Sequence, residues 1–111
     1  MKFKNMFSPI QIGPMTVKNR FVVPPMGNNF ANSDGTWSDE SVAYYGERAK
    51  GQFGLITIEA TVVHKGAKGG PKKPCLYDDN SIESLKKITD ACHAEGAKVS
   101  IQLQNAGPEG N

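Results

Sequence analysis

The sequence predicts an α/β protein, the N-terminal part of a (β/α)8 TIM barrel in which a hairpin is followed by a β-α-β-α-β unit. Two observations support this. Short apolar runs alternate with helix-length patterns, which favours parallel strands joined by right-handed helical crossovers. A hairpin precedes the first run, where it would cover the bottom of a barrel. A doubly wound open sheet begins in the same way and is the alternative, but it explains the hairpin less well.

The first elements are a hairpin and a strand. Apolar residues alternate over residues 10–17 on both sides of Gly13–Pro14, which is typical of a short hairpin. The apolar, β-branched run at 20–23 is typical of a strand buried on both faces, and Pro24–Pro25 ends it. The next segment, residues 26–37, is rich in Gly, Asn, Asp and Ser and is predicted to be a loop.

The first helix is predicted from its caps and its spacing. Ser38 is a good N-cap, and the acidic pair Asp39–Glu40 falls in the first turn, where the helix dipole favours it. Apolar residues recur at helical spacing at Val42, Tyr45 and Ala49. Gly51 is predicted to end the helix.

The pattern then repeats. Residues 54–58 form the second predicted strand, which runs into Glu59–Ala60 and a lysine-containing loop. Asn80 and Glu83 have the spacing of a capping box for the second helix. Its apolar stripe is Ile82, Leu85, Ile88 and Cys92, closed by Gly96. Residues 98–103 form the third strand.

Three parallel strands make a poor domain by themselves. If the sheet curls, both helices cover one face, and we expect apolar side chains such as Ile56 and Ile58 to be exposed on the other. A complete barrel takes about 250 residues, whereas this chain has 111 and its last residues, 106–111, read as a loop. We therefore predict that residues 1–111 are the incomplete N-terminal portion of a single domain. A self-contained small domain is the alternative.

Composition excludes several classes of protein. Thirteen basic and eleven acidic residues give a net charge of +2, which is not the strong excess of positive charge expected of a nucleic-acid-binding protein. No run approaches the roughly 18 apolar residues of a membrane span, and the N-terminus lacks the apolar stretch of a signal peptide. We therefore expect no nucleic-acid or membrane partner and a cytoplasmic location. In that reducing compartment Cys75 and Cys92 are predicted to be free thiols, with a disulfide between them as the alternative.

No catalytic residue or metal site is predicted from motifs. The spacing of Cys75, Cys92, His64 and His93 matches no zinc pattern. The lysine- and glycine-rich residues 65–70 fit neither phosphate-binding motif, so a solvated loop is predicted, with attraction of an anionic substrate as the alternative.

Two titratable residues remain open. His64 follows the second strand on the ligand-facing rim, where a catalytic role is conceivable. Glu59, at the tip of the same strand, is either a base or, more commonly for such a carboxylate, the partner of a cation from a neighbouring element.

Ligands of parallel α/β proteins bind at the carboxyl ends of the strands. These ends are predicted at residues 24–28, 59–61 and 102–107, which should meet on one rim. The Gln102 amide would offer two donors and an acceptor there, which matches a planar ring whose N–H is flanked by carbonyls. The alternative is that Gln102 satisfies nearby backbone groups.

Taken in order, several segments resemble the old yellow enzyme family of NADH:flavin oxidoreductases, which bind FMN in a (β/α)8 barrel. These segments are 7–13, 17–20, 24–26, 34–36, 44–51, 54–56, 77–79, 94–98 and 102–103. The residues in these segments are most similar to those of the enoate reductase and 2,4-dienoyl-CoA reductase branch.

The resemblance implies a set of cofactor-binding residues. Pro24, Pro25, Met26 and Gly27 match the segment along the flavin. Gly27 stands where relatives often carry Thr, Cys or a small residue, so hydroxyl or thiol tuning is lost. Ala60 matches a residue that touches the isoalloxazine, and Gln102 matches the amide that hydrogen-bonds its pyrimidine side. Asn105 and Pro108 depart from the family, which often has His and Arg there.

The implied function is that of an FMN-dependent ene-reductase. Hydride would pass from NADH or NADPH through the flavin to the activated C=C bond of a small unsaturated substrate. FAD and a 4Fe-4S cluster are expected only if a larger C-terminal extension exists. Residues 1–111 alone would hold one side of the flavin and be inactive. The alternative is a self-associating small α/β binding module without catalysis, and homo-oligomerisation of the enzyme is left open.

Overall fold

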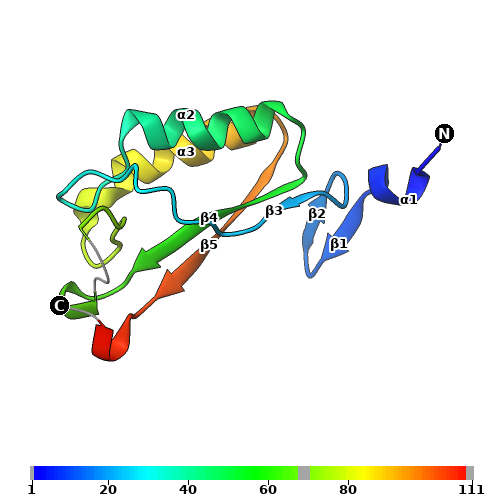
Figure 1. The fold of residues 1–111 in the computed structure, drawn as a ribbon. Coiled ribbons are helices and arrows are strands. Elements are labelled where there is room, and N and C mark those ends of the chain that lie inside the picture. The colour runs from blue at the N-terminus through cyan, green and yellow to red at the C-terminus, as the bar shows by residue number, and fades with distance from the viewer. Residues whose placement is uncertain (1, 68–70, 110–111) are drawn as a thin grey trace.

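Three parallel strands and two helices form the body of the protein in the computed structural model, which describes residues 2–67 and 71–109 (Figure 1). In chain order the elements are α1 (Lys4–Phe7), β1 (Ile10–Ile12), β2 (Met15–Val17), β3 (Val22–Val23), α2 (Asp39–Lys50), β4 (Leu55–Val62), η1 (Lys65–Ala67), η2 (Asp79–Ser81), α3 (Ile82–Ala94), β5 (Lys98–Gln104) and η3 (Gly107–Glu109). β1 and β2 form an antiparallel hairpin, and the second sheet has the order β3-β4-β5.

The predicted β-α-β-α-β unit is confirmed. Leu55 at the start of the central strand β4 pairs in parallel with Val22 of β3 and with Lys98 of β5. The strand lengths differ from the prediction. β3 is only two residues long, whereas β4 continues four residues past Ile58, because Val62 finds a further partner in Cys75.

Both helices lie on the same face of the sheet (Figure 1). The core between the layers contains Val23, Trp37, Tyr45, Ala49, Ile56, Ile58, Ile88, Cys92 and Ala97. The expectation that Ile56 and Ile58 would be exposed was wrong, because both are fully buried on the helix side. Strand alternation then places Thr57 and its neighbour Ser100 on the open face, where their hydroxyls hydrogen-bond at 2.7 Å.

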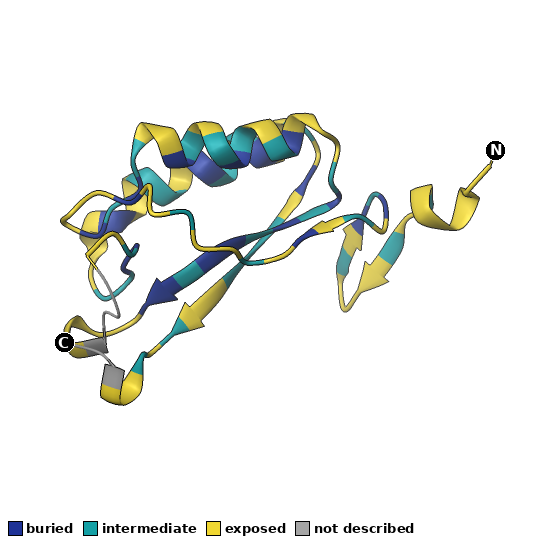
Figure 2. Ribbon diagram, in the orientation of Figure 1, coloured by how far each residue is buried: buried dark blue, intermediate teal, exposed yellow. Residues whose placement is uncertain are grey.

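Burial follows this layering (Figure 2). The helix sides that face β4 are buried, whereas all residues of the edge strand β5 are half-buried or exposed, because no other described strand pairs with its outer edge. Ile82, predicted to be in the apolar stripe of α3, is 56% exposed. It stands at the first position of the helix, before the stripe meets the sheet.

The helix ends confirm the caps predicted for α2 but not the capping box predicted for α3. Ser38 caps α2 by accepting a hydrogen bond from the Ser41 N–H, and Gly51 ends it. The capping box predicted for α3 is wrong. Instead, Asp78 accepts from the Asn80 N–H and starts a 3-10 turn that leads into α3, and Gly96 closes that helix at a φ of +79°.

The hairpin extends away from the layered body (Figure 1). The radius of gyration is 15.0 Å, compared with about 13 Å for a compact chain of this length. The segment after the hairpin is tied to the turns at the amino ends of β4 and β5. Lys18 Nζ donates to Glu95 O at 2.6 Å, and Asn19 Nδ2 donates to Gln52 O at 2.7 Å.

Candidate functional site

The carboxyl ends of the three parallel strands bring the predicted site residues together. Pro24, Pro25, Met26 and Gly27 follow β3 and continue along β4, as shown by the Asn28 N–H, which points to the Glu59 carboxylate at 3.4 Å. Between Ile58 and Thr61 the ladder to β5 shifts register, so that Glu59 and Ala60 both lie opposite Gln102. This arrangement is a β-bulge, a feature that is enriched beside active sites.

Gln102 presents a free amide at this place. Its side chain is exposed, and within the described residues it makes no hydrogen bond. The alternative reading, in which Gln102 satisfies nearby backbone, is therefore not what the structure shows. Two donors and an acceptor are available to a ligand.

The segment after β3 is largely exposed. Pro24 and Gly27 are exposed, Pro25 is half-buried, and Met26 is 47% exposed. Apart from residues 26–28, only one described atom comes within 4 Å of the position that a Cβ on Gly27 would occupy, and this is Lys73 Nζ at 3.7 Å. Lys73 was not predicted as a site residue, since nothing in the sequence links it to Gly27.

Glu59 is the most buried charged group of the site. It is 1% exposed, and its Oε1 accepts a hydrogen bond from the Tyr45 hydroxyl at 3.1 Å. The same hydroxyl accepts from the Glu59 N–H at 3.0 Å. The sequence favoured a cation as the partner of Glu59, and this was wrong: the partner is a phenol on α2. A helical Tyr at a core position gives no sequence signal for this role.

Burial controls the protonation of this pair. Desolvation raises the pKa of Glu59, against smaller opposing effects of the Asn28 N–H, the Tyr45 hydroxyl, the Trp37 indole and the Lys73 charge. The Trp37 indole N–H lies close enough to Glu59 to lower the pKa of its carboxyl, but it makes no hydrogen bond within the described residues. Desolvation also raises the pKa of Tyr45. The Glu59 side chain is thus held between α2 and the segment after β3.

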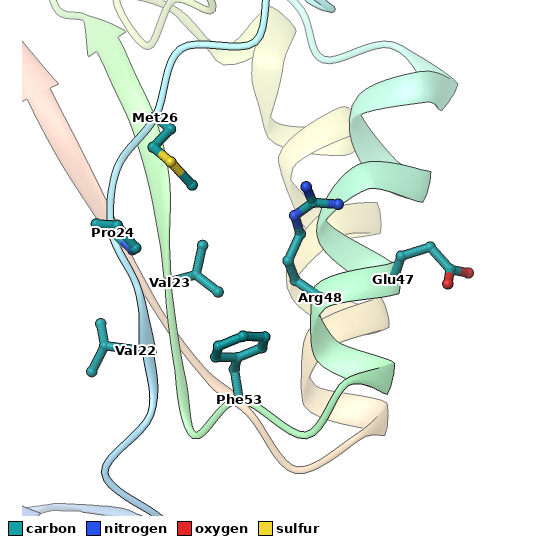
Figure 3. Close-up of a pocket in the computed structure, with 7 residues that line it drawn as sticks. All are labelled: Val22, Val23, Pro24, Met26, Glu47, Arg48 and Phe53. Carbon is teal, nitrogen blue, oxygen red and sulfur yellow. The ribbon is translucent and has the colours of Figure 1, made fainter.

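A hollow of about 360 Å³ lies between β3 and α2, next to this rim (Figure 3). Its lining is Val22, Val23, Pro24, Met26, Glu47, Arg48 and Phe53. Figure 3 shows Phe53 and Arg48 on the side of α2 that faces β3, whereas Glu47 points away. Arg48 is held by Tyr44, whose ring centre lies 3.6 Å from the guanidinium carbon.

A second hollow of about 220 Å³ lies at the opposite edge of the sheet. It is lined by Ile58, Leu85, Thr89, His93, Val99, Ser100 and Ile101. Both edges of the sheet therefore carry a largely apolar groove. One groove lies between β3 and α2, and the other lies between β5 and α3.

The remaining candidates have contacts of their own. The exposed His64 accepts a hydrogen bond from the Gly66 N–H through Nδ1, which keeps it in its own turn. Cys75 is buried against Val62, and Cys92 is buried under α2; both are free thiols, as predicted. Part of the lysine loop, residues 68–70, lies outside the described residues. Over 2–67 and 71–109 the structure gathers no group of three metal-ligating side chains.

None of the helices in the described part of the chain is both long enough and apolar enough to span a bilayer.

Solved structures of similar fold identify relatives. The old yellow enzyme of Trypanosoma cruzi is 36% identical, with a TM-score of 0.90 over 99% of this chain and 29% of that protein. A 2-naphthoyl-CoA reductase is 34% identical, with a TM-score of 0.92 over 97% of this chain and 16% of that protein. The old yellow enzyme from Pichia sp. AKU4542 is 36% identical, with a TM-score of 0.85 over 91% and 26%.

The chain thus spans less than a third of the length of each of these structures. A sequence profile for the NADH:flavin oxidoreductase / NADH oxidase family matches residues 5–111. This match covers nearly all of the sequence and agrees with the three structural relatives. The chain belongs to the NADH:flavin oxidoreductase / NADH oxidase family.

Proposed function

We propose that residues 1–111 form the first three strands of an FMN-binding (β/α)8 barrel, and that the whole protein is an ene-reductase. The family supports an FMN-dependent NAD(P)H oxidoreductase. The ene-reductase activity and the place of this chain in a barrel go further than the family. The edges of the sheet support the barrel, and the similarity to old yellow enzymes and to a 2-naphthoyl-CoA reductase supports the ene-reductase activity.

The two edge grooves support the barrel. In a (β/α)8 barrel every strand has a strand neighbour on each side, and every helix packs between two others. Here the exposed edges of β3 and β5 each carry an apolar groove of the kind that a further strand and helix would fill. Val22 and Leu103 are 49% and 61% exposed on these strands, which further supports missing neighbours.

The converging residues fit a flavin, and this observation carries the proposal. A flat ring needs a surface without protruding side chains, and Gly27 and Ala60 supply one at neighbouring strand ends. Its pyrimidine edge needs an amide that no protein group occupies, and Gln102 is such an amide. Pro24, Pro25 and Met26 would complete the contact on the β3 side. None of these groups titrates near neutral pH, so they position the ring and transfer no proton.

FMN, when bound, would supply the redox chemistry by taking hydride from NADH or NADPH and giving it to the activated C=C bond of a small unsaturated molecule. The residues of this chain would hold one side of the ring. Gln102 would fix its rotation by hydrogen bonds, and the bulge at Glu59–Ala60 would set the distance between β4 and the ring. We expect residues 1–111 alone to bind FMN weakly or not at all, since this chain lines only one side of the proposed site.

The test is FMN titration of the full product of the reading frame that encodes residues 1–111. We expect stoichiometric binding, and at least about fivefold weaker binding in Gln102→Leu, since leaving polar groups of the buried ring unpaired costs roughly 1–3 kcal/mol. Gln11→Leu, on the distant hairpin, is the matched control and should bind as the wild type does. Absence of binding by the wild-type product would refute the proposal.

A self-associating binding module is the second candidate, because the two apolar grooves also suit contacts between copies of this chain. Sedimentation of residues 1–111 separates the two. A defined symmetric oligomer with a cooperative melt supports the module, whereas aggregation or a molten monomer supports the barrel portion.

A further inference from the structure

The charged end of Lys73 lies beside Gly27, one of the residues of the proposed flavin surface. Its Nζ is 3.7 Å from the point where a Cβ on residue 27 would stand, and outside residues 26–28 no other described atom comes within 4 Å of that point. A positive charge therefore occupies the space beside the one residue of the segment after β3 that has no side chain.

The backbone around Lys73 is fixed. The Val62 N–H donates to Pro74 O at 2.9 Å, and the Leu76 N–H donates to Val62 O at 2.8 Å. These bonds extend the ladder of β4 into this segment, and both Pro74 and Cys75 are buried. The Cys75 N–H also donates to Gly35 O at 2.8 Å. The Lys73 side chain thus starts from an anchored position and projects toward Gly27.

Lys73 forms no ion pair with any of the described residues. Across residues 2–67 and 71–109 the ion pairs within 4 Å are Lys50–Glu47 and Lys86–Asp90, and Lys73 takes part in neither. The Glu59 carboxylate feels this charge, but its oxygens are used by Tyr45 and Asn28. A half-buried ammonium without a counter-ion is available to a ligand anion.

We propose that Lys73 contacts the edge of the bound flavin beside Gly27 and raises its reduction potential. This rests on the proposed FMN site. Reduction adds electron density to the ring, and a fixed cation close to the ring stabilises the reduced form relative to the oxidised form. Lys73 thereby adjusts the reduction potential of the flavin. It comes from the segment after β4, not from the segment that lines the ring.

The test measures the midpoint potential of bound FMN, by equilibration with a reference dye, in the full product of the reading frame. Lys73→Met keeps the length of the side chain and removes the charge. We expect its midpoint to fall by about 30 mV or more, which is a tenfold change in the equilibrium constant of a two-electron couple. Lys73→Arg should stay near the wild type. Lys72→Met, at the exposed neighbouring position, controls for loss of one positive charge.

The outcomes separate the two proposals. If the wild type binds FMN and Lys73→Met has the wild-type potential, the role of Lys73 is refuted and the FMN site stands. If the wild type binds no FMN, both fail. If Lys73→Met does not fold, Lys73→Gln removes the same charge with a polar side chain, and the same shift is expected.

Discussion

The Tyr45 hydroxyl and Glu59 hydrogen-bond to each other twice: the phenol donates to the carboxylate at 3.1 Å and accepts from the backbone N–H at 3.0 Å. Both side chains are 1% exposed. The pair joins α2 to the bulge of β4, and the second carboxylate oxygen lies 3.4 Å from the N–H of Asn28, just beyond Gly27. One buried contact thus connects a helix, the central strand and the segment that leads to the candidate site.

Removing the Tyr45 hydroxyl should destabilise the protein. Tyr45→Phe leaves the buried N–H and one carboxylate oxygen of Glu59 without a partner, and an unsatisfied buried polar group costs about 1–3 kcal/mol. We expect a loss of unfolding free energy in that range, measured by urea denaturation. Tyr44→Phe is the control, since the Tyr44 hydroxyl makes no hydrogen bond within the described residues. Equal effects of the two substitutions would contradict this role for the pair.

Glu59 should make stability depend on pH in a defined direction. Its pKa is raised above the ordinary value of 4.5, mainly by desolvation. Below pH 4.5 the carboxyl is neutral in the folded and the unfolded chain. As the pH rises, the unfolded chain loses this proton first, so the folded state loses stability up to the raised pKa.

Comparison with Glu59→Gln isolates this effect. Urea denaturation between pH 4 and pH 8 should show the unfolding free energy of the wild type falling relative to that of the variant as the pH rises. Glu83→Gln, at an exposed position on α3, controls for loss of one negative charge. A difference between wild type and Glu59→Gln that stays constant with pH would count against a desolvated carboxyl at this position.

Gly35→Ala should be costly because two effects combine there. The φ of Gly35 is +88°, and a Cβ would stand 2.8 Å from both Cβ and Sγ of Cys75. Gly13→Ala would have the strained positive φ without the steric clash, since the φ of Gly13 is +56° and no described atom beyond its chain neighbours lies within 4 Å of its Cβ position. We expect Gly35→Ala to lose about 1–3 kcal/mol more than Gly13→Ala, the usual cost of overpacking. Similar melting temperatures for the two variants would show that the loops around Gly35 and Cys75 separate freely.

The Cys92 thiol should react slowly in the folded protein. Burial raises its pKa to about 11. At pH 8 only about 0.1% of such a thiol is thiolate, compared with roughly a quarter for an unperturbed cysteine. Alkylation with iodoacetamide, followed by peptide mass spectrometry, should therefore be at least about 100-fold slower at Cys92 in buffer than in concentrated urea. A ratio near one would mean that α2 and α3 open readily above this residue.

The sequence predicted the features that are encoded over a few neighbouring residues. Ser38 and Gly51 bound a helix through groups in its own first and last turns, and the apolar runs of β4 and β5 mark strands whatever their pairing partners are. The same reasoning failed at the start of α3, where Asp78 and not Asn80 supplies the cap, because both residues have suitable side chains within one turn.

The candidate site could be predicted in part. That Gln102, Ala60 and Gly27 meet follows from parallel strands, whose carboxyl ends share one edge. The register shift at Glu59 and Ala60 was not predictable, since it depends on how β4 pairs with β5. A strand with one more or one fewer residue in register would present a different side chain to the same face.

The amino-acid sequence by itself determined the order of the elements and the parallel arrangement of the strands, because both depend on residue type and period. The tertiary structure alone decided what lies beside Glu59 and Lys73. Tyr45 reaches Glu59, and Lys73 reaches Gly27, only after the helix and the segment following β4 have packed on the sheet. Such contacts join residues far apart in the chain, and their geometry is fixed by packing rather than by any local pattern.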